Sequence, residues 1–360
     1  MLYEFNPVAA AKIPAADRNR ILENPGCGEY FTDHMASVHW TSERGWHNGL
    51  ISPYKPLQLD PANLTLQYSQ SVFDGLKAFR QPDGSVALFR PAQSAARLRR
   101  SARRLAMPDV PVQLFLDLCN ALVQADRDWV PFSPESSLYL RPLLMAEDRG
   151  LRVGSASRYR LLIIASPAVS HFRDGVKPIS VWLATDAIRA APGGIGAAKT
   201  GANYAASMAT QAEAEANGCE QVVWLDAVER KWLEGLSAMN LLLVRHGGHL
   251  LTPPVGDTVL PGITRDSIIR LARGEGFTVT ERKISLKEWK RGITDGSLTE
   301  AFSCGTTAAV APIGKVRTPW GDWIISDGSP GDISLRLRRQ LLEIQTGRAP
   351  DPYGWLAKVV

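Results

Sequence analysis

A single lysine lies among small residues in the stretch 193–207, which reads GGIGAAKTGANYAAS, and Tyr204 follows Lys199 by five positions. Small side chains leave room for a large flat ligand against the backbone. Apolar neighbours desolvate the amine of Lys199 and favour its neutral, nucleophilic form. Because the chain has 11 lysines against 30 arginines, a lysine in this setting stands out. The stretch favours a Schiff base between Lys199 and pyridoxal phosphate.

Two further clusters of small residues could bind the phosphate of such a cofactor. The segment 260–265, LPGITR, precedes an apolar-periodic helix at 266–273, so Gly262 and Thr264 offer backbone N–H groups at a helix start. The segment 303–309, SCGTTAA, supplies hydroxyls and open backbone. Each cluster alone is typical of an ordinary helix cap or a buried turn. Together with the Lys199 stretch they favour a phosphate-bearing cofactor.

The Lys199 stretch also resembles a nucleotide-binding loop. The pattern Gly193-xxxx-Ala198-Lys199-Thr200 differs by one residue from GxxxxGK[ST], with a predicted strand before it and a helix after it. Asp226, at the end of a later strand, could serve as a magnesium-binding partner. Ala198 replaces a glycine whose backbone freedom the loop needs. Nucleotide hydrolysis is the weaker alternative but stays open at this point.

A basic run at 97–104, RLRRSARR, predicts an amphipathic helix with a basic outer face. It is typical of a solvated surface, although one arginine of the run could bind a small-molecule phosphate. Nucleic-acid binding is disfavoured because the run is short and lacks interleaved aromatic residues.

Composition indicates an ordinary globular chain with two domains, because 360 residues exceed what one hydrophobic core usually supports. The net charge is +5, and 45% of the residues are hydrophobic. We find no apolar run of about 18 residues, so we expect no membrane span, and the first residues do not resemble a signal peptide. The four cysteines form no CxxC pair, which predicts a cytoplasmic location and no metal site.

The elements that must position these residues predict a mixed α/β fold in two halves. The predicted strands are 86–89, 137–141, 159–165, 179–184 and 221–226, and the predicted helices are 93–106, 111–127, 203–216 and 266–273. Residues 1–60 are predicted to form an extended arm with short elements. We expect a smaller domain at 1–170, a linker at 171–180 and a larger cofactor domain at 181–360, and the Pro- and Gly-containing stretch 166–178 is the segment that favours a linker there.

These motifs resemble those of the branched-chain amino acid aminotransferases, pyridoxal phosphate enzymes of fold type IV. The resemblance runs from about Phe31 to the C-terminus and keeps the family's order of motifs. The motifs are 31–35 (FTDHM), 72–78 (VFDGLKA), 88–91 (LFRP), 199–204 (KTGANY), 238–240 (AMN), 260–265 (LPGITR) and 304–306 (CGT). The resemblance implies a two-domain α/β fold, a homodimer, and an amino acid and a 2-oxo acid as substrates.

The resemblance also implies roles for individual residues. Lys199 would carry the cofactor and move the substrate's α-proton, and Tyr204 would bind the phenolic oxygen of the cofactor. Arg97 would bind the phosphate, together with the backbone of Gly262, Ile263 and Thr264 and with Thr306. The other expected cofactor contacts are Arg189, Gly235, Ser237, Ala238, Leu260 and Gly305, and the expected substrate contacts are Phe31, Tyr68, Phe73, Tyr139, Arg141 and Thr307.

One departure from the family pattern bears on the chemistry. The family places a glutamate five residues before the asparagine of its Met-Asn motif, where it pairs with the pyridine nitrogen. Here that position is Gly235, and the neighbouring Glu234 would point to the other face of a regular strand. Unless a bulge shifts the register, the pyridine nitrogen lacks its carboxylate. The pocket positions Gln67, Asp74, His171, Ser237, Ala238 and Thr307 also differ from common family residues.

We therefore expect transamination of a small, apolar, branched amino acid with 2-oxoglutarate as acceptor. A weaker electron sink at the ring would instead favour another reaction of the same fold, such as a racemase or lyase step. A non-catalytic paralogue that binds the cofactor or only dimerises is a third alternative.

Overall fold

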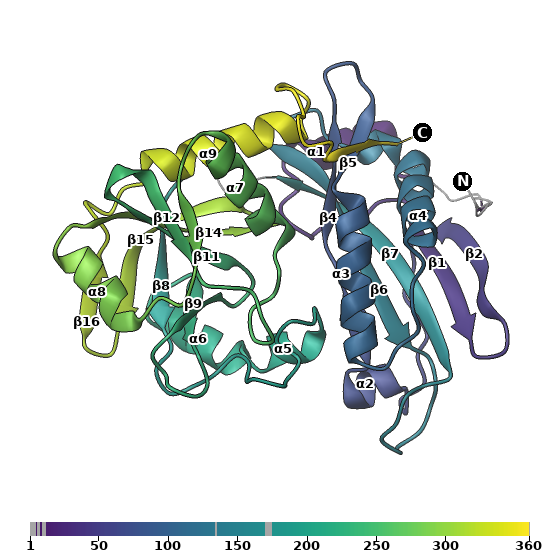
Figure 1. Cartoon of the computed structure of the whole chain (residues 1–360). Helices are drawn as coiled ribbons and strands as arrows, with labels where there is room; N and C mark the ends of the chain where they lie inside the picture. Colours follow the sequence, from purple (N-terminus) through teal and green to yellow (C-terminus); the bar gives the residue numbers. More distant parts are fainter. Residues whose placement is uncertain (1–4, 6–7, 9–11, 134, 170–174, 360) are drawn as a thin grey trace. The chain divides into compact units, whose positions relative to one another are not determined.

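The computed structural model describes residues 5, 8, 12–133, 135–169 and 175–359, and its chain divides into two compact units (Figure 1). Unit 1 comprises residues 1–170, 198–201 and 344–360, and unit 2 comprises residues 171–197 and 202–343. Of the predicted linker, residues 171–174 lie outside the described residues. The wider linker candidate, 166–178, overlaps a long strand that includes Ser166 and ends at Val169.

Unit 1 is built on an eight-stranded sheet in the order β17-β5-β4-β6-β7-β1-β2, with β3 paired to β6. The strands are β1 (His34–Thr41), β2 (Gly45–Pro53), β3 (Ser71–Phe73), β4 (Leu76–Arg80), β5 (Val86–Phe89), β6 (Ser136–Ala146), β7 (Arg158–Val169) and β17 (Leu356–Lys358). Its helices are α1 (Ala15–Glu23), α2 (Leu64–Tyr68), α3 (Pro91–Arg104) and α4 (Val112–Ala125), with the 3-10 turn η1 (Arg127–Trp129).

The core of unit 1 follows from apolar spacing. Helix α4 carries Leu114, Leu118 and Leu122 four residues apart, so these side chains share one face, and all three are fully buried. Strand β7 contributes the nearly continuous apolar run that predicted it. The prediction of an extended arm over residues 1–60 is wrong, because β1 pairs along its length with β7.

Unit 2 contains a nine-stranded sheet in the order β10-β9-β8-β15-β14-β11-β12-β13, with β16 paired to β15. The strands are β8 (Ile179–Leu183), β9 (Gln221–Leu225), β10 (Leu233–Leu236), β11 (Asn240–Arg245), β12 (His249–Thr252), β13 (Val279–Glu281), β14 (Leu298–Gly305), β15 (Ala309–Thr318) and β16 (Gly321–Ile324). The helices are α5 (Gly201–Ala205), α6 (Met208–Ala216), α7 (Ile263–Gly274) and α8 (Leu286–Thr294), with the turn η2 (His246–Gly248), and α9 (Asp332–Gln345) ends at the unit boundary.

One predicted helix of unit 2 is broken, and one short strand is irregular. The helix expected over 203–216 is broken between α5 and α6, and it ends before Gly218, whose φ of 66° is left-handed. Strand β10 is irregular: its register against β9 shifts between Leu233 and Gly235. The other predicted strands and helices are confirmed within a few residues. Among the described residues, no helix is long and apolar enough to span a bilayer.

Candidate active site

The lysine segment is anchored within unit 1. Residues 198–201 belong to this unit, although the chain on both sides belongs to unit 2. The backbone N–H of Lys199 donates to Ser101 Oγ on α3 at 2.9 Å, and its carbonyl accepts from Phe73 N at 2.9 Å. The hydroxyl of Thr200 donates to Ser71 O at 2.8 Å. The segment is therefore held on the edge of β3, which fixes where the lysine side chain starts.

The Lys199 ammonium lies over an aromatic ring. Its Nζ is 4.9 Å from the centroid of the Phe73 ring, and the Arg141 guanidinium lies 4.8 Å from the same centroid. Arg141 also donates to the hydroxyl of Tyr139 at 3.1 Å. A side chain at Gly75 would overlap this hydroxyl. The structure thus brings together four of the predicted residues, Lys199, Phe73, Tyr139 and Arg141.

Arg97 is not on a solvated basic face. It is buried, and its Nε and Nη2 donate to the two carboxylate oxygens of Asp74 at 2.8 and 2.7 Å. Asp74 is fully buried and also accepts from Gly75 N. The exposed residues of the run are Arg100, Arg103 and Arg104. A phosphate-binding role for Arg97 stays a prediction, and any such contact would act beside this ion pair.

Tyr68 and Phe31 are also predicted to bind the substrate, but they contact residues outside that cluster. Tyr68 is exposed and donates its hydroxyl to Leu151 O at 2.6 Å. Phe31 stacks on Tyr54 with ring centroids 5.0 Å apart. Both stay predictions, as do the other substrate residues. His171 lies outside the described residues.

In unit 2 the predicted phosphate loop ends at a helix start. Gly262 precedes α7 in an extended conformation and, being a glycine, has no side chain to cap the helix. The loop is held by Asn240 Nδ2, which donates to Leu260 O at 3.1 Å, and a Cβ at Gly262 would overlap Asn240 Oδ1. Glycine at this position therefore lets the loop close over Asn240. The N–H groups of Ile263 and Thr264 lie in the first turn, where anions bind helices.

Glu234 of strand β10 and Arg189 both form hydrogen bonds with Thr258. Glu234 is buried, and its Oε1 accepts from the hydroxyl of Thr258. Arg189 donates to the carbonyls of Thr258 and Gly196. Burial raises the pKa of Glu234, against the hydrogen bond from Thr258 and the charge of Arg189. Nothing in the sequence pattern pointed to Thr258 or Ser101.

The remaining residues predicted to bind cofactor or substrate differ in burial and in contacts. Ser237 accepts from Trp224 Nε1 at 3.1 Å, and a Cβ at Gly305 would crowd Met239. Ala238 and Thr307 are exposed, whereas Tyr204 and Thr306 are half-buried. No contact of these residues tests the roles predicted for them.

Asp226 has a structural role. Its carboxylate accepts backbone N–H groups from Val228, Glu229, Lys231 and Trp232 at 2.7–3.2 Å. Asp226 therefore stabilises the turn between β9 and β10. This role explains an aspartate at the end of β9 without a magnesium ion. The described residues include no cluster of His, Cys, Asp or Glu suited to a metal ion.

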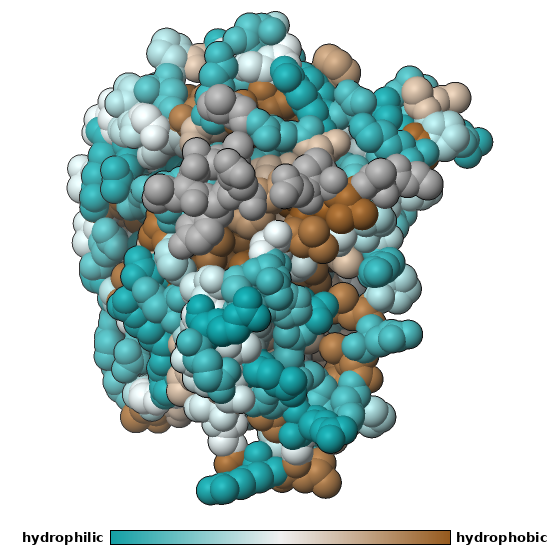
Figure 2. Space-filling model, turned by 90° about the vertical axis from the view of Figure 1, so that its right-hand side faces the viewer, coloured by the Kyte–Doolittle hydropathy of each residue, from teal (hydrophilic) through white to brown (hydrophobic). Residues whose placement is uncertain are grey.

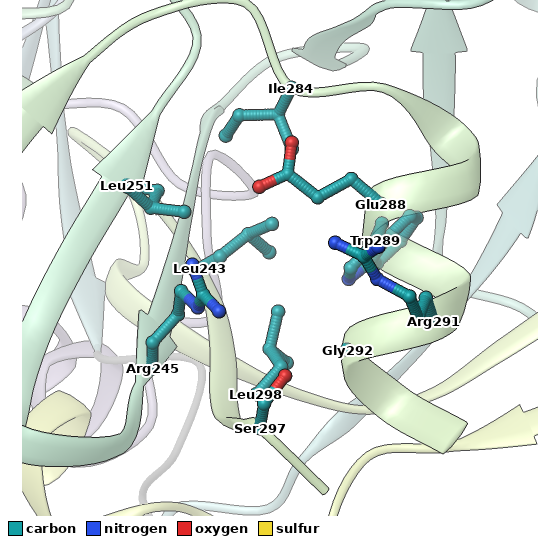
Figure 3. A pocket seen from close by; sticks show the side chains of 10 residues that line it. All are labelled: Leu243, Arg245, Leu251, Ile284, Glu288, Trp289, Arg291, Gly292, Ser297 and Leu298. Carbon is teal, nitrogen blue, oxygen red and sulfur yellow. The ribbon is translucent and has the colours of Figure 1, made fainter. Parts of the chain in front are cut away.

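A small pocket of unit 2 lies outside the candidate site. Figure 3 shows side chains of β11 and α8 pointing toward one another across it, with an apolar floor that includes Leu243 and Leu298. Arg245 and Arg291 also line it, as does Trp289, whose side chain is fully buried. None of the residues predicted to bind cofactor or substrate lines this pocket.

Comparisons with known proteins identify the family. A model of the amino-transferase class IV family matches residues 71–316. The chain belongs to this family. A probable branched-chain-amino-acid aminotransferase of Streptomyces coelicolor is 49% identical over 98% of this chain and 97% of its own length. The branched-chain-amino-acid aminotransferase of Mycolicibacterium smegmatis is also 49% identical, with the same two coverages.

Solved structures of branched-chain amino acid aminotransferases have the same fold. The Escherichia coli branched-chain amino acid aminotransferase matches with a TM-score of 0.74 and 25% identity, over 90% of this chain and 100% of its own. The Thermobaculum terrenum enzyme in its PLP form matches with a TM-score of 0.74 and 26% identity, over 90% and 98%. The predicted family, fold class and enzyme class are confirmed, and the nucleotide-hydrolase alternative is wrong.

Proposed function

We propose that this class IV aminotransferase transfers the amino group of a branched-chain L-amino acid to 2-oxoglutarate, with pyridoxal phosphate as cofactor. The observation that carries the substrate class is 49% identity across nearly the whole length of branched-chain aminotransferases. The anchored Lys199 supports the cofactor, because a lysine fixed at its backbone presents one amine reproducibly.

The residues of the structure fit pyridoxal phosphate. Glu234 Oε2 is buried and has no hydrogen-bond partner among the described residues, as expected of an acceptor that awaits a ligand donor. Helix α7 begins directly after Gly262, and the N–H groups in the first turn of a helix suit a phosphate. Both observations belong to unit 2, and the lysine belongs to unit 1.

When bound, pyridoxal phosphate supplies an electron sink that stabilises negative charge at the substrate Cα. The protein supplies binding and proton transfer. The Lys199 amine is the group that holds the cofactor and then takes and returns the substrate's α-proton at Nζ. Phe73 limits water near that amine and lies against its charged form. The Arg141 guanidinium, exposed beside Tyr139, is suited to a substrate carboxylate.

The test is a steady-state assay with Leu, Ile or Val and 2-oxoglutarate, comparing the wild type with Lys199→Ala. We expect all three amino acids to be turned over and the variant to lose at least about 10³-fold in kcat, because proton transfer and cofactor attachment share one amine. Lys177→Ala is the control, since it removes an exposed lysine of unit 2. Activity retained in Lys199→Ala would overturn the assignment.

The same assay separates the alternatives. Conversion of an L-amino acid to its enantiomer, or its elimination without any need for 2-oxoglutarate, would establish altered chemistry. Cofactor binding without turnover of any amino acid would establish a non-catalytic paralogue.

We further propose a cytoplasmic homodimer. Unit 1 exposes several large apolar side chains, namely Tyr30, Leu50, Tyr54, Leu66, Tyr68, Phe132, Leu151 and Val153. On the face drawn in Figure 2, hydrophobic residues reach the surface among hydrophilic ones. Exposed apolar groups of this kind support a protein interface. Light scattering coupled to size exclusion tests the proposal, and a monomer at micromolar concentration would contradict it.

A further inference from the structure

The irregularity of β10 changes where Glu234 points. Leu233 pairs with Leu225 and Gly235 pairs with Trp224, so Glu234 is an extra residue with no partner on β9. A bulge of this kind bends the strand and re-aims the side chain of the extra residue. The expectation from a regular strand, that Glu234 faces away from the position of the residue at 235, therefore does not hold.

Gly235 lets the chain close tightly after the bulge. Leu236 N donates to Met239 O at 2.9 Å, and a Cβ placed on Gly235 would lie only 3.2 Å from the same carbonyl oxygen. A larger residue at 235 would push this turn away. The glycine and the bulge thus belong together: Glu234 is the extra residue of the bulge, and Gly235 leaves room for the Met239 carbonyl beside it.

Only one of the two carboxylate oxygens of Glu234 has a hydrogen-bond partner among the described residues. Thr258 donates its hydroxyl to Oε1, while Oε2 is buried and has no partner among the described residues. Arg189 donates to the carbonyl of Thr258 and so steadies the residue that positions the glutamate. A buried carboxylate oxygen with an unused lone pair is a strong acceptor for a cationic N–H donor.

We propose that Glu234 Oε2 accepts the hydrogen bond of the protonated ring nitrogen of pyridoxal phosphate, in place of a carboxylate at position 235. Thr258 and Arg189 are positioning residues for this contact. The inference rests on the proposed function, since it requires the cofactor. It also predicts that the ring keeps its full capacity as an electron sink, so the glycine does not redirect the reaction away from transamination.

The test is the protonation state of the ring nitrogen, read by ¹⁵N NMR of protein reconstituted with ¹⁵N-labelled pyridoxal phosphate. We expect a protonated nitrogen in the wild type at neutral pH and a neutral one in Glu234→Gln. The dissociation constant of the cofactor should rise about tenfold or more in the variant, as for loss of a charged hydrogen bond. Glu213→Gln, an exposed glutamate of α6, is the control and should change neither quantity.

Thr258→Val provides a second variant that keeps the carboxylate but removes its anchor. It should also raise the dissociation constant of the cofactor, but by a smaller factor than Glu234→Gln. If Glu234→Gln does not fold, Thr258→Val provides the test. A ring nitrogen that stays protonated in both variants would overturn the role of Glu234, as would a neutral nitrogen in the wild type. If borohydride fails to trap the cofactor on Lys199 of the wild type, the proposed function fails instead.

Discussion

At the scale of single residues, the Asp74–Arg97 pair shows how burial changes the role of a charged side chain. Both partners are almost fully buried, and two parallel hydrogen bonds join them. Such a pair adds little net stability, because the cost of desolvating both charges opposes their attraction. Loss of one partner is strongly destabilising, because it leaves the other charge buried without a counter-charge. Arg97 therefore depends on Asp74 whether or not it also binds a phosphate.

Asp74→Asn should lower the free energy of unfolding by about 3 kcal/mol, because it leaves the Arg97 guanidinium buried without its counter-charge. Urea unfolding measures the change. The matched control is Asp109→Asn, which breaks a two-bond pair with Arg99 that is partly exposed and should cost less than about 1 kcal/mol. Equal losses in the two variants would contradict the importance of burial.

At the scale of elements, a strand bulge and a helix start decide which groups face a ligand. Strand β10 gains one unpaired residue, which turns the side chain of Glu234. Helix α7 begins directly after Gly262, which fits only because it has no Cβ to meet Asn240. Strand β10 has only four residues, so its geometry depends on neighbouring strands rather than on local propensity.

Gly235→Ala should destabilise the protein by about 1–2 kcal/mol, because its Cβ would crowd the carbonyl of Met239 at 3.2 Å. It should also weaken the binding of pyridoxal phosphate, because it disturbs the bulge. The measurement is thermal unfolding with and without added pyridoxal phosphate. Gly154→Ala is the control, since a Cβ there meets nothing within 4 Å. If Gly235→Ala unfolds at the same temperature as the wild type, the turn can accommodate a Cβ without loss of stability.

At the scale of the whole molecule, partly buried ion pairs couple the stability of unit 1 to pH. Glu147 accepts from His39 Nδ1 at 2.9 Å and pairs with Arg160. Burial raises the pKa of Glu147, but the hydrogen bond from His39 and the charges of Arg160 and His39 together lower it below its usual value. A lowered carboxyl pKa stabilises the fold above the unfolded pKa, and this stability disappears as the pH falls through the folded pKa.

Glu147→Gln should therefore lower the free energy of unfolding at pH 7 by about 1 kcal/mol, since the pair is partly exposed. The difference from the wild type should shrink as the pH falls from the unfolded-state pKa through the lower folded-state pKa of Glu147, because the wild-type carboxyl is then protonated as well. Urea unfolding at several pH values measures this. A difference that stays constant down to the lowest pH would show that packing, rather than charge, causes the loss.

The sequence by itself determined the chemistry-bearing groups and the family, because these depend on residue types at short, local spacings. Lys199 with Tyr204, the loop before α7 and the Ser303–Ala309 cluster could all be read directly, and so could the buried strands with continuous apolar runs. Only the tertiary structure decided which face Glu234 presents, since strand register depends on the partner strand. Only it showed that Arg97 is buried against Asp74, and that residues 198–201 are anchored to β3 and α3 in unit 1. The Asp74–Arg97 and Lys199–Ser101 contacts join residues far apart in the chain, and the register of β10 depends on the residues of β9, so no pattern within one segment encodes them.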